Sequence, residues 1–77
     1  MTRDEVASRI TDLIRDRSVV EVEIIREDMK LVEDLGFDSL DRIELGIVIE
    51  DEFGIEVEDS VLKEIATVRD VINMVLR

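Results

Sequence analysis

Apolar residues in this chain recur every three or four positions, which is the spacing of one face of an α-helix. The pattern runs through Val6, Ile10, Leu13 and Ile14 near the start and through Val68, Val71, Ile72 and Val75 near the end. The chain has 77 residues and no proline. Proline is the residue that most strongly breaks a helix, so none of these predicted helices is interrupted by one. A chain of this length builds one small core. We therefore expect a single all-α domain over residues 1–77.

Capping signals place the ends of the predicted helices. Thr2 with Glu5, and Thr67 with Asp70, have the spacing of a capping box, and Gly54 is a typical helix stop. Together with the apolar spacing, they predict helices over 2–17, 39–53, 59–65 and 68–76. The expected fold is a small four-helix bundle with three longer helices and a short third one.

The long segment before the second helix is harder to interpret. Residues 20–25 alternate as a strand would, but a lone strand has no partner with which to pair. We predict a long ordered connection over residues 18–38, pinned by some of its apolar residues: Val20, Val22, Ile24, Ile25, Met29 and Leu31. A loop this long in a small domain is often functional.

Acidic residues dominate the middle of the chain. The sequence has 21 acids, 10 bases and a formal net charge of -11. Residues 27–64 hold fourteen of the acids and only three of the bases. Such a charge run is usually a solvated face, but it also favours basic protein partners. It argues against binding to nucleic acid, and no apolar run is long enough for stable membrane insertion.

The residue types that are missing limit the possible chemistry. There is no histidine and no cysteine, so the commonest general base and the usual soft metal ligands are absent. We expect no catalytic site and no metal site in so small a chain. The absence of cysteine fits a reducing compartment, and the start of the chain lacks a secretory signal pattern. We therefore expect a cytoplasmic protein.

One segment carries a specific motif. Asp38-Ser39-Leu40 follows Leu35-Gly36 and opens the acidic second helix. This arrangement resembles the phosphopantetheine attachment motif of acyl carrier proteins, and the resemblance extends over about residues 29–76. It implies a four-helix carrier with a 4′-phosphopantetheine arm on Ser39, attached from coenzyme A by a phosphopantetheinyl transferase. Asp38, beside the serine, would help that transferase recognise the site.

The attachment role of Ser39 has a physical basis and a simpler alternative. The N-terminus of a helix favours an anion such as a phosphodiester, through its free amides and its dipole. The alternative is that Ser39 or Asp38 merely caps the helix, which stabilises a helix by about 1 kcal/mol. A carrier also needs no base of its own, because the modifying enzyme supplies it.

The resemblance assigns partner contacts to the second helix. Its recognition acids correspond to Asp41, Glu44, Glu50 and Asp51, and its exposed apolar contacts correspond to Leu40 and Ile47. These residues would bind basic surfaces of acyl-transferring and chain-elongating enzymes. The alternatives are that the acids are simply solvated and that Leu40, Ile43 and Ile47 form the core-facing side of the helix.

Two residues depart from the family pattern. Gly46 stands mid-helix, where the family usually has a larger aliphatic residue, and glycine there costs about 1 kcal/mol relative to alanine. We hypothesise a widened pocket beneath the helix for a bulky acyl chain, unless neighbours such as Phe37 or Ile49 fill the space. Phe37 is bulkier than the usual residue, and we expect it to pack over the arm or to select partner enzymes.

The function that follows is carriage of acyl thioesters, in fatty acid biosynthesis or a related pathway, by a monomer. One alternative is a specialised carrier for polyketide, peptidyl or lipid-modification chemistry, although Asp38 favours acyl over peptidyl cargo. Another is an acidic helical interaction module without a cofactor. A calcium loop is excluded because the required spacing of acids is not met, and a carboxylate enzyme is disfavoured by the small size.

Overall fold

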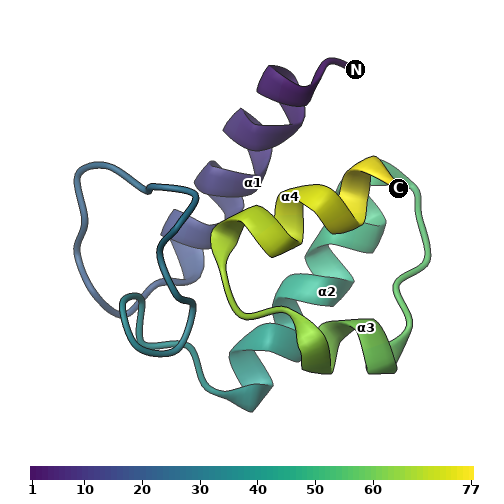
Figure 1. Ribbon diagram of the computed structural model, residues 1–77. Helices are drawn as coiled ribbons and strands as arrows, with labels where there is room; N and C mark the ends of the chain where they lie inside the picture. The colour runs from purple at the N-terminus through teal and green to yellow at the C-terminus, as the bar shows by residue number, and fades with distance from the viewer.

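Four helices form the framework of the protein (Figure 1). The computed structural model describes all residues, 1–77, and contains α1 (Arg3–Arg17), α2 (Ser39–Phe53), α3 (Asp59–Glu64) and α4 (Val68–Leu76). The only extended pairing is one isolated bridge between Lys30 and Thr67. The predicted all-α fold, with three longer helices and a short third one, is confirmed.

The predicted capping signals are all in place. The Thr2 hydroxyl accepts a hydrogen bond from the Glu5 amide at 3.2 Å, and the Glu5 carboxylate accepts one from the Thr2 amide at the same distance. The latter bond is the main cause that lowers the pKa of Glu5. Gly54 ends α2 in the left-handed conformation, with φ 65°, which costs glycine little.

The core is entirely apolar, and no polar or charged side chain is buried in it. In Figure 1, α4 crosses α2, and α1 lies behind α4; α1 packs against both α4 and α2. The side chains with no exposed surface are contributed by the first connection and by every helix except α3: Ile10, Ile14, Leu31, Leu35, Leu45, Ile49, Val68, Val71 and Ile72. Burying side chains of this size is the main stabilising contribution in a domain this small.

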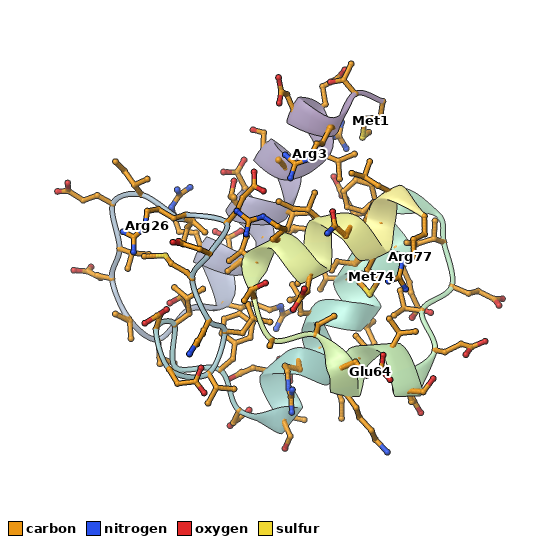
Figure 2. All side chains as sticks on the ribbon, in the orientation of Figure 1. Met1, Arg3, Arg26, Glu64, Met74 and Arg77 are labelled. Carbon is orange, nitrogen blue, oxygen red and sulfur yellow. The ribbon has the colours of Figure 1, made fainter.

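The C-terminal helix differs from the prediction at one position. Met74 is buried, whereas Val75 is only half-buried. Met74 projects from α4 toward the side of the molecule where α3 lies (Figure 2). A flexible methionine fills an irregular gap better than a branched residue can, and the periodicity alone could not rank the two.

The first connection, residues 18–38, is ordered by the junction between α3 and α4. The Leu31 amide donates to the Ala66 carbonyl at 2.9 Å, and the Val68 amide donates to the Met29 carbonyl at 3.0 Å. Of the apolar residues predicted to pin this segment, Ile25, Met29 and Leu31 are buried, and Val22 is half-buried. The prediction that some of these residues pin the segment is confirmed, and Val20 and Ile24, whose side chains are exposed, are not among those that do.

An ion-pair network strengthens the same junction. Glu27 lies between Arg3 of α1 and Arg69 of α4, with 3.4 Å between a Glu27 oxygen and Nε of Arg69. The bidentate hydrogen bond from Arg3 holds the pKa of the Glu27 carboxyl below its usual range. The first connection is therefore held to α1 and α4 by side chains, in addition to its backbone bonds to α4.

Helices α2 and α3 approach closely at Gly46. A Cβ atom at this position would lie 2.7 Å and 2.8 Å from the two methyl carbons of Leu62 and 3.3 Å from its Cγ. The space that glycine leaves is therefore filled by Leu62 of α3, and not by Phe37 or Ile49. The hypothesis of a widened interior at Gly46 was wrong, because Leu62 of α3 occupies that space.

Candidate functional site

The N-terminus of α2 presents Ser39 with its hydroxyl unused. Asp38 is the N-cap: its carboxylate accepts from the Asp41 amide at 2.8 Å, and the Asp41 carboxylate accepts from the Asp38 amide at 3.0 Å. The Ser39 hydroxyl makes no hydrogen bond in the protein and the residue is exposed. Of the two capping alternatives, Asp38 is therefore correct, and Ser39 has no structural task in the cap.

The backbone around Ser39 fits an attached phosphodiester. The Ser39 and Leu40 amides have no acceptor in the protein, and unpaired amides at the start of a helix favour an anion. The carboxylates of Asp38 and Asp41 oppose a further negative charge, but both are engaged in the capping box. The exposed hydroxyl is a point at which a phosphate ester can form, and the two free amides beside it can donate to the phosphate oxygens.

A pocket of about 260 Å³ opens beside Ser39, between α2 and α3. Its lining residues come from the start of α2 and from α3: Ser39, Arg42, Ile43, Asp59, Leu62 and Lys63. Neither Arg42 nor Lys63 forms an ion pair, although these are two of only three bases in residues 27–64. The pocket therefore combines aliphatic side chains with unpaired positive charge, next to the free hydroxyl.

Helix α2 carries an exposed apolar stripe as well as a buried one. Leu40, Ile43 and Ile47 are 60%, 51% and 59% exposed, respectively. Leu45 and Ile49 face the core instead. The interpretation of Leu40, Ile43 and Ile47 as the core-facing side was wrong, and their exposure leaves them free to contact another molecule. Sequence reasoning had left Ile43 out of the partner contacts, and the three share one face by their i, i+3, i+7 spacing.

The four predicted recognition acids differ in their surroundings. Glu44 pairs with Arg17 of α1 at 2.6 Å, and Glu50 accepts a hydrogen bond from the Val57 amide at 2.9 Å. Asp41 belongs to the capping box. Only Asp51 is exposed and without a partner. The acids therefore share one helix, but three of them also have structural contacts.

Phe37 lies in the core and not over the site. Its side chain is only 2% exposed, and its amide donates to the Leu31 carbonyl at 2.9 Å. The expectation that it packs over the arm or selects partners was wrong. Its ring instead anchors the end of the first connection, directly before the cap of α2.

Two further findings bear on the type of site. No group of three or more acidic, cysteine or histidine side chains is arranged to hold a metal ion. None of the four helices has the length and apolar character needed to cross a membrane.

Comparison with known proteins gives a consistent result. Residues 8–75 match the family described as a phosphopantetheine attachment site. The chain is 41% identical over 76 residues to an acyl carrier protein of Chloroherpeton thalassium, with 99% of this chain and 95% of that protein covered. It is 36% identical over 74 residues to an acyl carrier protein of Thermotoga maritima, covering 96% of this chain and 91% of that protein.

The fold agrees as well. A solved structure of a candidate acyl carrier protein from Mycobacterium tuberculosis has a TM-score of 0.85 at 34% identity, covering 92% of this chain and 95% of that one. Both sequence and structure therefore lead to one assignment. The chain belongs to the acyl carrier proteins, the phosphopantetheine-bearing family whose members carry acyl groups.

Proposed function

We propose that Ser39 is the attachment point of the 4′-phosphopantetheine arm. The observation that carries the proposal is that the Ser39 hydroxyl is exposed and makes no hydrogen bond, while Asp38 does the capping. The free amides of Ser39 and Leu40 would stabilise the charge of the phosphodiester. The arm, once attached, supplies a terminal thiol that holds acyl groups as thioesters.

The protein contributes presentation and recognition, and no catalytic group. Asp38 is held in one orientation by its bond to the Asp41 amide, so a transferase would meet a fixed carboxylate beside the hydroxyl. The pocket between α2 and α3 adjoins Ser39 and would shelter an acyl group from water. Its two aliphatic lining residues, Ile43 and Leu62, favour burial of an acyl chain through the hydrophobic effect.

Partner enzymes would dock on the exposed face of α2. The apolar stripe of Leu40, Ile43 and Ile47 would supply contact area, and the acids Asp41, Glu44, Glu50 and Asp51 would attract basic residues of the enzyme. Asp51 would contribute most among these acids, because it has no contact to give up. Such contacts weaken as salt rises, which suits a monomeric carrier that moves between acyl-handling enzymes of fatty acid biosynthesis.

The experiment is intact mass spectrometry after incubation with coenzyme A, magnesium and a broad-specificity phosphopantetheinyl transferase. Wild type should gain one phosphopantetheine unit, and Ser39→Ala should gain none while its circular dichroism spectrum is unchanged. Ser60→Ala is the matched control, because Ser60 is also an exposed serine in the first turn of a helix. Loading of Ser39→Ala, or none of the wild type, would overturn the assignment.

A further inference from the structure

The Leu62 side chain makes two contacts that matter for an acyl group. It is one of the side chains that line the pocket beside Ser39. It is also the side chain that sits on the backbone of α2 at Gly46, where a Cβ atom would approach its methyl carbons to 2.7 Å and 2.8 Å. Leu62 is therefore the wall between the pocket and the tight contact of α2 with α3.

Behind Leu62 lies a position on α2 that has no side chain, Gly46. Leu62 is buried, with 8% of its surface exposed, and the position it covers on α2 has no side chain. If Leu62 turned away, the pocket would extend along bare helix backbone at Gly46 and not into another side chain.

We propose that Leu62 is a gate residue that sets the length of acyl chain the pocket shelters. With Leu62 on Gly46, a short chain occupies the pocket as it stands. A longer chain fits only if Leu62 leaves Gly46 and the chain takes its place. The proposal rests on the attachment of the arm to Ser39, and it identifies the cargo favoured by the resting structure as short acyl groups.

The hydrophobic effect gives the expected dependence on chain length. Each methylene group that moves from water into the pocket raises the ratio of sheltered to exposed chain by about fourfold. The gain should continue with each added methylene until the chain meets Leu62, and then it should stop. In a close-packed interior even a one-methylene change in the wall is felt, so a smaller side chain at position 62 should move the stop to a longer chain.

The first test measures thioester hydrolysis for a series of loaded carriers, from butyryl to dodecanoyl. In wild type, the hydrolysis rate should fall as the chain grows and then level off. In Leu62→Val, the plateau should begin at a longer chain, with a plateau rate about fourfold lower for one further sheltered methylene. Ile65→Val is the matched control: it also removes one methylene from a buried residue next to α3 but does not line the pocket, and its plateau should match wild type.

The second test uses wild type alone and so does not depend on how a variant folds. With the methyl groups of leucine labelled for NMR, the Leu62 resonances should stay near their positions in the arm-only form for short chains. They should shift sharply at the chain length where hydrolysis reaches its plateau, because only then does the chain displace Leu62. The Leu45 methyls, buried elsewhere in the core, serve as the internal reference.

The outcomes separate this proposal from the attachment itself. If intact mass shows no arm on Ser39, the proposed function fails and the gate is irrelevant. If the carriers load but Leu62→Val has the same plateau as wild type, or if the Leu62 methyls do not respond to chain length, the gate is wrong and the attachment stands.

Discussion

The N-termini of α2 and α4 share one capping device but differ in everything around it. Both begin with a reciprocal pair, Asp38 with Asp41 in α2 and Thr67 with Asp70 in α4. In α4 the next residue, Val68, is fully buried, and its amide donates to Met29 of the first connection. In α2 the next residue is Ser39, which is exposed and has a free amide.

The difference shows that a cap fixes where a helix begins but not what its first turn does. The first two amides of α4 donate to the Met29 and Glu27 carbonyls of the first connection. This end of the helix therefore holds two segments of the fold together. The first two amides of α2 are left to the solvent, and this end is available for a ligand. The same local chemistry supports structure at one site and function at the other, depending on what packs against it.

Truncating the residue after each cap should give the largest contrast. Val68→Ala should lower the free energy of unfolding by about 2–3 kcal/mol, because two buried methyl groups and their packing are lost. Ser39→Ala, the equivalent change in α2, should stay within about 0.5 kcal/mol of wild type, because its hydroxyl has no bond in the protein. Urea unfolding followed by circular dichroism measures both. Equal losses in the two variants would contradict the contrast.

Removing the N-cap residue should destabilise the protein by a similar amount at both helices, because α2 and α4 begin with the same type of capping box. Thr67→Ala and Asp38→Ala should each lower the free energy of unfolding by about 1 kcal/mol, because each leaves one helix amide without its acceptor. Thermal unfolding of both variants checks this, with Thr67→Ser and Asp38→Asn as controls that keep an acceptor. A negligible effect of Asp38→Ala would mean that the cap of α2 does not stabilise the helix.

The smallest difference between the two helix N-termini should appear in how the free energy of unfolding depends on pH. Hydrogen bonds from the Ala66 and Thr67 amides hold the pKa of the Asp70 carboxyl below its usual range. Because the folded pKa is lowered, this carboxylate stabilises the protein above the unfolded value of about 3.9 and ceases to do so as the pH falls through the folded pKa.

The measurement is unfolding of wild type and Asp70→Asn from about pH 7 to about pH 2. The two should differ by less than about 1 kcal/mol at neutral pH, and the difference should shrink toward zero below about pH 4. Asp41→Asn is the matched change in α2, where the carboxylate accepts from one backbone amide and not two, so its effect at neutral pH should be smaller. A constant difference across the whole range would exclude this role of Asp70.

The helices could be predicted from sequence because their signals are local. The bounds of α2 and α4 match the prediction, and the helices before and between them differ by one residue at one end. A capping box or a glycine stop acts within one turn, so the residues that decide it are adjacent in the sequence. The Asp-Ser-Leu motif was likewise readable because its residues are consecutive.

The features that could not be predicted all depend on contacts between distant segments. Helix α2 has apolar residues on two faces, and periodicity alone cannot tell which one meets the core. Leu45 and Ile49 are buried in a core that α1, α4 and the first connection also supply, while Ile47 is left outside. The burial of Phe37 and the seating of Leu62 on Gly46 have no signal in neighbouring residues either.

The bonds between the first connection and the junction of α3 with α4 also bear on folding, because they join segments far apart in the sequence. Three backbone hydrogen bonds join residues 27–31 to residues 66–69, and the chain must close a large loop before it gains any of these three bonds. Loops of this kind slow a small domain relative to a bundle with only neighbouring contacts. During synthesis, the segment that leads into Ser39 can reach its final conformation only after the last helix has emerged from the ribosome.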